Sequence, residues 1–368
     1  MMRAPILMMA GGTGGHIYPA LAIARSLEQH AQSVVWLGTP HGLEARVVPA
    51  AGIPMERISI SGLRGRGFLG WLTAPFRLGW SVFQSWRIIR RLAPKMVIGM
   101  GGFVSGPGGI AAKLAGVPLL IHEQNAIAGM TNRWLAKVAG RVLQGFEGAF
   151  SPAVEATTVG NPVRGDVRAI APPAQRYNGR DGSLRLLVVG GSLGAKALNE
   201  TVAPAIALMA PEQRPTIRHQ AGSPTLGLAQ DAYAAAGIRA EVTPFIEDMA
   251  GALSWADLVI CRAGAITIAE LINVGLPAVL VPFPHAVDDH QTANARSLVE
   301  AGAALLLPQS EMSPERLQSA MTNLGMQRET LLDRANKARA LRGQDPVSLV
   351  LAACARLIDD EALSVEAS

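Results

Sequence analysis

The sequence predicts an α/β protein built from two doubly wound domains, each with a parallel sheet covered by helices on both faces. A buried apolar stretch runs into a glycine-rich loop and then into a helical pattern at two places in the chain. These loops begin at Gly11 and Gly190, 179 residues apart in a chain of 368. A strand that enters a glycine turn and a helix opens a βαβ unit, so its repetition half a chain apart favours two domains over one.

The second observation is the alternation of short apolar runs with helical patterns, which is typical of parallel sheets buried on both faces. After the opening runs at 6–10 and 186–189, the predicted strands are residues 34–37, 96–100, 119–122, 142–143, 258–261 and 278–282. The predicted helices are residues 19–30, 108–115, 130–139, 195–209, 267–274 and 291–300. The predicted division is a first domain at 1–162, a second at 163–344, a helix at 345–358 that packs back on the first, and a tail at 359–368.

Composition excludes several classes of protein. Hydrophobic residues make up 49% of the chain and charged residues 17%, which excludes a disordered chain. Two cysteines, Cys261 and Cys354, cannot staple a chain of this length, and free thiols fit a reducing compartment. The first residues are expected to form a strand rather than a signal peptide, and no apolar run reaches the ~18 residues of a membrane-spanning helix.

Charge is distributed unevenly along the chain. Residues 1–160 hold 15 Lys and Arg against 6 Asp and Glu, a net charge of +9, whereas residues 161–368 hold 18 against 22, a net charge of −4. Between residues 57 and 122 there are nine basic residues and no acidic one. This pattern predicts that the first half works beside an anionic partner, for which nucleic acid and a lipid surface are the candidates.

The glycine loop that begins at Gly11 predicts a ligand site. Glycines let the backbone turn sharply and let a ligand approach closely, and the N–H groups of the next helix favour an anion or a polar sugar group. The loop lacks the lysine of an ATPase P-loop, and the second strand is not closed by the acid of a dinucleotide site. Simple close packing of the turn is the alternative, but six further glycines at 99–109 favour a lined cleft.

Polar side chains are expected beside this loop. His16 stands at the start of the following helix, whose positive end favours a neutral imidazole that can accept a proton. His122, Glu123, Gln124 and Asn125 close another strand at its carboxyl end, where open α/β sheets bind ligands. A capping or packing histidine is the alternative for His16. Because no His-x-x-x-His, Cys-x-x-Cys or Asp-x-Asp spacing occurs, we predict no metal site.

The second half carries a run of residues that fits a nucleotide sugar. Ala265, Ile266 and Thr267 open a helix whose N–H groups, together with the Thr267 hydroxyl, can bind a diphosphate. Glu270 follows within about one turn and can accept both hydroxyls of a ribose, although an acid is also simply favourable near a helix start. Gln291 can hydrogen-bond sugar hydroxyls with either end of its amide.

Aromatic side chains and arginines gather in the acid-free stretch. They are Phe68, Trp71, Phe76, Trp80, Phe83, Trp86, Arg87, Arg90 and Arg91. Apolar and aromatic residues flanked by arginines fit an interfacial membrane patch better than a base-stacking strip. A core helix over residues 78–92 with a solvated basic face is the alternative. We therefore predict an anionic membrane surface, and no nucleic acid, as a partner.

Six motifs, in order, resemble glycosyltransferase family 28, which includes the peptidoglycan N-acetylglucosaminyltransferases. They are GGTGGH at 11–16, GGFVSGPGG at 101–109, HEQN at 122–125, GNPVR at 160–164, GGSLG at 190–194 and RAGAITIAE at 262–270. The resemblance implies the GT-B fold, with two Rossmann-like domains facing a cleft. It implies inverting transfer of N-acetylglucosamine from UDP-N-acetylglucosamine to the 4-hydroxyl of undecaprenyl-pyrophosphoryl-N-acetylmuramoyl-pentapeptide (lipid I), which gives lipid II, with no cofactor and no structural metal.

By position, the resemblance assigns UDP-N-acetylglucosamine contacts to both halves. They are Thr13, Gly14, Gly15, Asn125, Arg164, Ser192, Ile246, Ala265, Ile266, Thr267, Glu270 and Gln291. Ile246 would flank the uracil, and Glu270 would hold the ribose. Acceptor or cleft candidates are Gly102, Phe103, His122, Glu123 and Gln124. Phe103 stands where a tyrosine is expected; His16 is the candidate base, and the helix start at Ala265 would stabilise the leaving diphosphate.

The resemblance further implies peripheral binding at the cytoplasmic face of the inner membrane, and a role in cell shape and division beside other cell-wall synthesis proteins. Three alternatives stay open. They are another GT-B glycosyltransferase with a lipid acceptor, a UDP-sugar epimerase, and a non-catalytic protein of the same fold that binds membrane or nucleic acid. An epimerase would not need the basic aromatic stretch, which favours the transferase.

Overall fold

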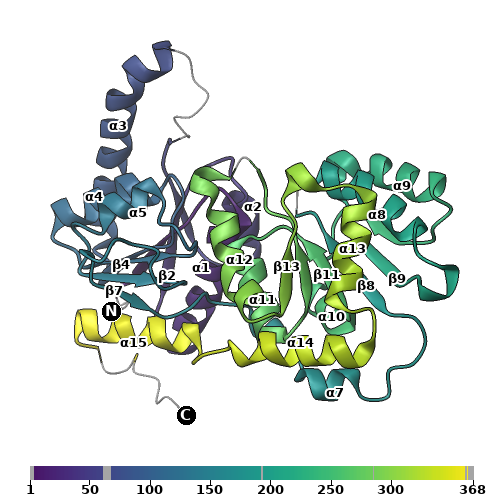
Figure 1. Ribbon diagram of the computed structural model, residues 1–368. Helices are drawn as coiled ribbons and strands as arrows, with labels where there is room; N and C mark the ends of the chain where they lie inside the picture. The colour runs from purple at the N-terminus through teal and green to yellow at the C-terminus, as the bar shows by residue number, and fades with distance from the viewer. Residues whose placement is uncertain (1–3, 61–67, 192–193, 285, 361–362, 364–368) are drawn as a thin grey trace. The chain divides into compact units, whose positions relative to one another are not determined.

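The computed structural model describes residues 4–60, 68–191, 194–284, 286–360 and 363, and it describes no side chain at 68–72 or 287. The chain divides into two compact units (Figure 1). Unit 1 consists of Met1–Arg164 and Gly343–Ser368, and unit 2 of Gly165–Arg342. Within the described ranges, no helix combines the length and the apolarity needed to cross a bilayer.

Unit 1 contains a seven-stranded sheet in the order β3-β2-β1-β4-β5-β6-β7, in which all neighbouring strands are parallel. Its strands are β1 (Ile6–Met9), β2 (Val34–Gly38), β3 (Met55–Arg57), β4 (Met96–Gly99), β5 (Leu119–Glu123), β6 (Arg141–Gln144) and β7 (Ala156–Thr158). Its helices are α1 (Gly14–Gln29), α2 (Glu44–Ala50), α3 (Phe68–Leu92), α4 (Ser105–Ala115), α5 (Met130–Leu135) and α15 (Pro346–Ile358).

Both faces of this sheet are buried, which explains why its central strands are continuously apolar. Successive side chains of a strand point to opposite faces. Ile6 and Met8 of β1 therefore pack with α1 and α15 in one core cluster, whereas Leu7 and Met9 pack with α3 and α4 in another. Helix α15 returns from the end of the chain to cover unit 1 through Leu351 and its neighbours (Figure 1).

Unit 2 contains a six-stranded, all-parallel sheet in the order β10-β9-β8-β11-β12-β13. Its strands are β8 (Arg185–Val189), β9 (Thr216–Gln220), β10 (Glu241–Thr243), β11 (Leu258–Cys261), β12 (Ala278–Leu280) and β13 (Ala304–Leu306). Its α-helices are α6 (Gly165–Arg168), α7 (Pro173–Tyr177), α8 (Lys196–Ala207), α9 (Leu226–Ala235), α10 (Met249–Trp255), α11 (Ala265–Val274), α12 (His290–Glu300), α13 (Pro314–Leu324) and α14 (Arg328–Ala340). Short 3₁₀ turns lie at η1 (Pro211–Gln213), η2 (Ser223–Thr225), η3 (Val287–Asp289) and η4 (Gln309–Glu311).

A buried acid joins the chain before β8 to the sheet of unit 2. Asp257, 0% exposed, forms an ion pair with Arg180 and accepts a hydrogen bond from the backbone N–H of Arg185 at 3.0 Å. The Tyr177 hydroxyl donates to the Asp257 carbonyl at 2.8 Å, and burial raises the pKa of this hydroxyl. These contacts satisfy a charge that would otherwise be costly to bury.

Some predicted boundaries differ from the observed ones. Helix α1 begins at Gly14 rather than at residue 19, because the second half of the glycine loop forms its first turn and Pro19 lies inside the helix. Helix α5 ends at Leu135, four residues before the predicted end. In the described part of the tail, Asp360 pairs with Lys95 at 3.0 Å, and Leu363 is buried in the core of unit 1.

Candidate active site

In each sheet, two loops flank the point where the strand order reverses. In unit 1, β1 and β4 are neighbours, and the chain continues from β1 to β2 on one side and from β4 to β5 on the other. In unit 2, β8 and β11 are neighbours, and the chain continues from β8 to β9 on one side and from β11 to β12 on the other. A crevice opens outside the carboxyl ends of two such strands, and open α/β sheets bind ligands there. The predicted site motifs at 11–16 and 101–109 follow β1 and β4, and those at 190–194 and 262–270 follow β8 and β11.

The two glycine loops of unit 1 lie directly against each other. Gly102 has a φ of +82°, and a Cβ there would collide with the carbonyl of Gly11. Gly101 has a φ of +95°, and a Cβ there would lie 2.7 Å from Nδ1 of His16. Only glycine fits both the backbone conformation and the close approach, so these residues bring the second loop onto the first and onto His16.

Thr13, Gly14 and Gly15 form the start of α1. Thr13 is the N-cap residue, with an extended backbone, and the sequence places no acid in the first turn. The first N–H groups of a helix have no partner inside it and carry a partial positive charge, which favours an anionic or polar ligand. The structure therefore places these three predicted residues where such a ligand would bind.

Glu44, which the sequence analysis missed, supports the first glycine loop. Its side chain is 0% exposed and its Oε2 accepts a hydrogen bond from the N–H of Gly12 at 3.1 Å. Its Oε1 accepts from the N–H of Thr39 at 3.1 Å and from the Thr39 hydroxyl at 2.6 Å. Glu44 stands five residues beyond Thr39, and its side chain points back toward the glycine loop. Its position soon after the end of β2 is the only feature of the sequence that could have indicated this role.

Glu123 holds the loop that follows β5. Its carboxylate, 2% exposed, accepts hydrogen bonds from the N–H and the side-chain amide of Asn125 at 3.0 and 3.1 Å. It also accepts from the Gly129 N–H at 3.1 Å and from the Asn132 side chain at 2.8 Å. Glu123 is predicted as an acceptor or cleft residue, and these contacts show that its carboxylate orients Asn125.

His16, Gln124 and His122 form a connected group. His16 Nδ1 lies 2.7 Å from Gln124 Oε1, and Gln124 Nε2 lies 3.1 Å from His122 Nδ1. His122 Nε2 lies 2.9 Å from the carbonyl oxygen of Gly160. His122 is fully buried, and this burial lowers its pKa to about 4. The structure thus brings together three residues that the sequence places in two separate motifs.

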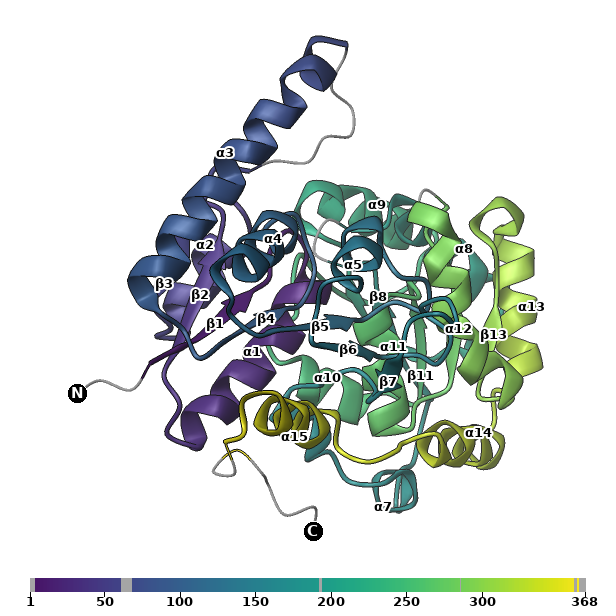
Figure 2. The same ribbon diagram turned by 90° about the vertical axis from the view of Figure 1, so that its left-hand side faces the viewer.

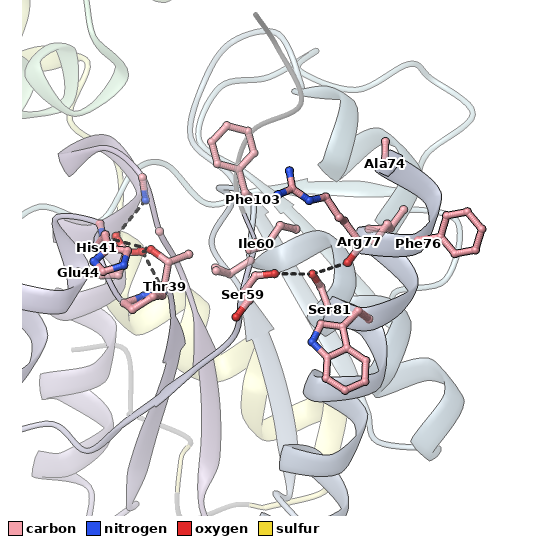
Figure 3. Close-up of a pocket in the computed structure, with 17 residues that line it drawn as sticks. Thr39, His41, Glu44, Ser59, Ile60, Ala74, Phe76, Arg77, Ser81 and Phe103 are labelled. Atoms are coloured by element: carbon pink, nitrogen blue, oxygen red, sulfur yellow. Dashed lines mark hydrogen bonds between the residues drawn. The ribbon is translucent and has the colours of Figure 1, made fainter. Parts of the chain in front are cut away.

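A cavity of about 810 Å³ opens beside these loops in unit 1. It is lined by Gly11, Gly12, Thr39, Pro40, His41, Gly42, Glu44, Ser59, Ile60, Ala74, Phe76, Arg77, Leu78, Trp80, Ser81, Phe103 and Val104. Figure 3 shows the Arg77 side chain extending toward Phe103, with Thr39 and Glu44 on the opposite side. Phe103 is 55% exposed. Because the lining includes residues of the first glycine loop and of the aromatic helix α3, the cavity lies between these two parts of unit 1.

Helix α3 has a buried face and an exposed aromatic face. Ser81, Ser85, Ile88 and Ile89 are buried, whereas Phe76, Trp80 and Phe83 are 83%, 56% and 44% exposed. The exposed rings continue into Trp86, with 5.6 Å between the Trp80 and Phe83 centroids and 6.3 Å between those of Phe83 and Trp86. Arg87, Arg90 and Arg91 are exposed, and the Arg90 guanidinium lies 5.6 Å from the Trp86 ring centroid. The Phe68 and Trp71 side chains lie outside the described residues.

The N-terminal part of α3 stands clear of the rest of unit 1 in both views (Figures 1 and 2). The predicted alternative is a core helix over residues 78–92. It accounts for the buried face of the second half of α3 but not for the exposed aromatic face. Large aromatic rings on the exposed face of a soluble protein mark an interaction surface.

In unit 2, the second glycine loop follows β8. Gly194 has a φ of +77°, and a Cβ there would collide with the carbonyl of Ala221, so a side chain is excluded. The loop leads to α8, and the N–H of Gly190 at its start donates to the carbonyl of Gln220 in β9 at 3.2 Å. Ser192, predicted to contact the nucleotide sugar, lies outside the described residues.

Helix α11 carries the predicted diphosphate and ribose residues. Gly264 is its N-cap, Ala265 its first residue, and Thr267 and Glu270 are partly buried on its first two turns. Burial first, and then the charge of Glu270, raise the pKa of the Cys261 thiol to about 12, so this cysteine is an inert thiol of the core. Glu270 lies on the helix that directly follows the carboxyl end of β11.

Gln291 lies in the first turn of α12, and Ile246 lies on the connection that follows β10. Gln291 Oε1 accepts a hydrogen bond from the Phe283 N–H at 2.9 Å, so a sugar contact would use its Nε2 as donor. Ile246, partly buried, lies between β10 and α10. Arg262, which the sequence analysis did not assign, donates to the carbonyls of Val281 and Pro282 at 3.2 and 3.1 Å and so holds the segment that Gln291 contacts.

Comparison with known families identifies the family to which this fold belongs. The Glycosyltransferase family 28 N-terminal domain matches residues 6–144, and the Glycosyltransferase family 28 C-terminal domain matches residues 185–348. The chain belongs to glycosyltransferase family 28. The two matches cover both glycine loops and the motifs at 101–109, 122–125 and 262–270, so the predicted family is confirmed.

Relatives in family 28 match over nearly the whole chain. A protein of Marinobacter nauticus is 53% identical over 96% of this chain and 97% of its own length, and one of Alkalilimnicola ehrlichii is 55% identical over 96% and 99%. Both are named UDP-N-acetylglucosamine--N-acetylmuramyl-(pentapeptide) pyrophosphoryl-undecaprenol N-acetylglucosamine transferase. The crystal structure of Acinetobacter baumannii MurG matches with a TM-score of 0.81 and 43% identity, over 94% of this chain and 97% of that one.

The predicted α/β fold of GT-B type, with two Rossmann-like domains, is confirmed by these matches and by the two parallel sheets. The fold alone does not fix the reaction. A UDP-N-acetylglucosamine 2-epimerase of Listeria monocytogenes matches with a TM-score of 0.68 at 15% identity, over 100% of both chains. Among the residues that the structure describes, no three His, Cys, Asp or Glu side chains gather as metal ligands would.

Proposed function

We propose that this chain transfers N-acetylglucosamine from UDP-N-acetylglucosamine to the 4-hydroxyl of undecaprenyl-pyrophosphoryl-N-acetylmuramoyl-pentapeptide, with inversion at the anomeric carbon. The observation that carries the proposal is the identity of more than half the residues with full-length relatives that bear this name. The loops at the switch points of both sheets support it, because each contains the glycines, polar side chains or helix start that such substrates need.

Unit 2 is proposed to bind the UDP moiety. The start of α11, with Ala265, Ile266 and the Thr267 hydroxyl, offers N–H and O–H donors to the diphosphate. Glu270, further along α11, would accept hydrogen bonds from the ribose hydroxyls. Ile246 would pack against the uracil, and Gln291 would donate its Nε2–H to the sugar.

The chemical step needs a base and a stabilised leaving group. His16 is proposed to take the proton of the acceptor hydroxyl as its oxygen attacks the anomeric carbon. The bond from that carbon to the diphosphate breaks, and the electron pair leaves with UDP. Donors at the helix start near Ala265, with Ser192 and Arg164, would stabilise the charge that develops there. Thr13, Gly14, Gly15 and Asn125 would hold the sugar.

The cavity beside α3 is proposed to receive the acceptor. The acceptor named for the relatives joins a pyrophosphate to a hydrocarbon chain. The cavity has matching parts, since Arg77 supplies a positive charge and the rings of Phe76, Trp80 and Phe103 supply apolar surface. The glycine loops at its edge would place the acceptor sugar near His16.

The exposed aromatic face of α3 is proposed to rest on an anionic membrane surface, at the cytoplasmic face of the inner membrane. Helices α4 and α5 of the same unit also expose apolar side chains. Ile110 and Leu114 of α4 are 40% and 67% exposed, and Trp134 of α5 is 65% exposed with Lys137 4.4 Å from its ring centroid. Apolar side chains that enter the headgroup region, with basic side chains at the phosphates, are typical of peripheral membrane proteins.

A transfer assay tests the proposal and separates it from the epimerase alternative. The purified chain is incubated with isotope-labelled UDP-N-acetylglucosamine and a lipid I analogue in the presence of EDTA. We expect label in a disaccharide lipid only when the acceptor is present. Conversion of the donor to another UDP-sugar without transfer would instead identify an epimerase, and the absence of any reaction would overturn the proposed function.

A further inference from the structure

The proposed base is connected to a second histidine through a single glutamine. His122 is 0% exposed, and its Nε2 lies 2.9 Å from the carbonyl oxygen of Gly160. A carbonyl oxygen only accepts hydrogen bonds, so this Nε2 carries a proton and donates it. Because burial lowers the pKa of His122 to about 4, the ring is neutral near pH 7 and its Nδ1 holds a lone pair.

Two acceptors fix the orientation of the Gln124 side chain. One end of its amide lies 3.1 Å from His122 Nδ1 and 3.2 Å from the backbone carbonyl oxygen of His122. Both of these atoms need a donor, so this end is the NH₂ group. The other end of the amide, Oε1, therefore faces His16. Gln124 is 1% exposed, and its own carbonyl accepts a hydrogen bond from Asn161 at 2.9 Å, which holds the backbone in place.

The orientation of Gln124 determines which nitrogen of His16 carries the proton. Gln124 Oε1 lies 2.7 Å from His16 Nδ1, and an amide oxygen only accepts, so Nδ1 carries the proton. A neutral His16 then keeps its lone pair on Nε2, the other ring nitrogen. Gly101 approaches the same side of the ring, so the second glycine loop and Gln124 both lie against the Nδ1 side of His16.

We propose that His122 and Gln124 are positioning residues that hold His16 as the Nδ1–H tautomer, so that Nε2 is the atom that accepts the proton of the acceptor hydroxyl. The role of His16 as base rests on the proposed function, whereas its tautomer rests on the hydrogen-bond geometry alone. In the transfer the hydroxyl proton goes to Nε2, the hydroxyl oxygen bonds to the anomeric carbon, and the bond to the diphosphate oxygen breaks with its electron pair leaving on UDP. The glutamine orients the ring without adding a negative charge.

Unit 2 supplies an internal reference for measuring this tautomer. Asn199 Nδ2 donates to the carbonyls of Ala221 and Thr225 at 3.0 and 3.1 Å, so its Oδ1 is an acceptor. His219 Nε2 lies 3.0 Å from this Oδ1 and must carry the proton. We therefore expect His219 and His122 to be Nε2–H tautomers and His16 to be the opposite one.

Nitrogen-15 NMR of the full chain, labelled at its histidines, tests the tautomers without any substrate. Signals of His16 are identified by their loss in His16→Gln. Above neutral pH we expect Nδ1 of His16 to show the shift of a protonated nitrogen and Nε2 that of an unprotonated one. The reverse pattern for His16 in the unsubstituted chain would overturn the inference, whatever the activity.

Two variants of similar side-chain length separate orientation from general damage. Gln124→Met removes the acceptor, so both His16 nitrogens should move toward averaged shifts, while the shifts of His219 stay unchanged. Gln124→Glu keeps an oxygen at the same place and should restore the Nδ1–H form. In the transfer assay Gln124→Met should lower kcat about 10- to 100-fold with the donor KM little changed, a part of the ~10²–10⁴-fold that a positioned base supplies. An unaltered tautomer in Gln124→Met, or an unaltered kcat, would contradict the proposal.

Discussion

His16 combines three features that suit a catalytic base. It stands in the first turn of a helix, it is only partly buried, and its Nδ1 is engaged by a buried amide. A base needs an accessible lone pair and a fixed ring, and these features supply both.

The first prediction at the residue scale concerns His16→Ala. Loss of a positioned base should lower kcat about 10²–10⁴-fold, with the KM for UDP-N-acetylglucosamine little changed. Steady-state kinetics of transfer measure both constants. His30→Ala is the matched control, since His30 is the C-cap residue at the other end of α1 and its Nδ1 lies 2.7 Å from the carbonyl oxygen of Ser26. A loss in His16→Ala of less than about tenfold would assign His16 to sugar positioning instead.

Glu270→Ala should chiefly weaken the binding of the donor, UDP-N-acetylglucosamine. Hydrogen bonds from the ribose hydroxyls to a charged carboxylate contribute about 1.5–3 kcal/mol, so we expect the donor KM to rise about 10- to 100-fold. The acceptor KM should stay unchanged. Glu300→Ala, an exposed acid of unit 2, serves as control. An unaltered donor KM in Glu270→Ala would remove the ribose role.

At the residue scale, the sequence singled out the polar side chains of the motifs but not the side chains that hold the loops around them. His16, Gln124 and Glu270 lie in motifs whose polar residues stand at strand ends. Glu44 and Arg262 orient loops through contacts with residues such as Gly12 and Val281, and a single sequence contains no signal for such pairings.

At the scale of elements, apolar runs predicted most of the central strands, whereas the short edge strands and β9 were missed, including β13, which is itself apolar. β3 has the sequence MER and β10 has EVT, and both are partly exposed at sheet edges. β9 has the sequence TIRHQ, in which the buried His219 is paired with Tyr233 and Asn199. Edge strands and buried polar networks break the apolar pattern, because neither needs a continuous hydrophobic face.

The aromatic face of α3 leads to a prediction about membrane binding. In Phe76→Ser/Trp80→Ser the apolar surface is lost, and burial of each such side chain is worth about 1.5–3 kcal/mol. Sedimentation with vesicles that contain anionic lipid should show binding weakened by at least about tenfold. Leu208→Ser, at a 53% exposed leucine of unit 2, is the matched control. Equal binding by the double variant and the control, or binding independent of lipid charge, would exclude this surface.

Two buried histidines, each on a strand of a different unit, predict how stability depends on pH. Burial lowers the pKa of His122 and of His219 from 6.5 to about 4. The unfolded state therefore binds more protons than the native state between about pH 6.5 and 4, so stability falls as the pH falls through this window. Each histidine accounts for about 3 kcal/mol of this loss.

Urea unfolding between pH 7 and pH 4.5 measures this effect. His219→Gln removes a group that binds a proton when unit 2 unfolds in this pH window. The slope of the free energy of unfolding of unit 2 against pH should therefore correspond to about one proton per molecule fewer than in the parent chain. Because a chain of two units need not unfold in one step, unfolding is followed by tryptophan fluorescence and by circular dichroism together. If the stability of unit 2 depended on pH identically in the variant and the parent chain, the effect could not be assigned to His219.

At the scale of the whole molecule, repetition was the most informative signal. Gly11 and Gly190 each follow the strand at the switch point of a sheet, which explains why two glycine loops half a chain apart predicted two similar units. The return of α15 to unit 1 places the last helix with the first, and buried residues such as Leu351 make this contact. The reaction itself was predictable only through the resemblance, because many proteins with this fold perform other reactions.

The structure of the product tests the central claim most directly. The disaccharide lipid formed from UDP-N-acetylglucosamine and lipid I is isolated, and its new glycosidic bond is examined by proton NMR. We expect the bond at the 4-hydroxyl of the N-acetylmuramoyl sugar, with the large H1–H2 coupling of a β linkage, because a single displacement inverts the α-linked donor. A retained α linkage, attachment at another hydroxyl, or no product at all would contradict the proposed reaction.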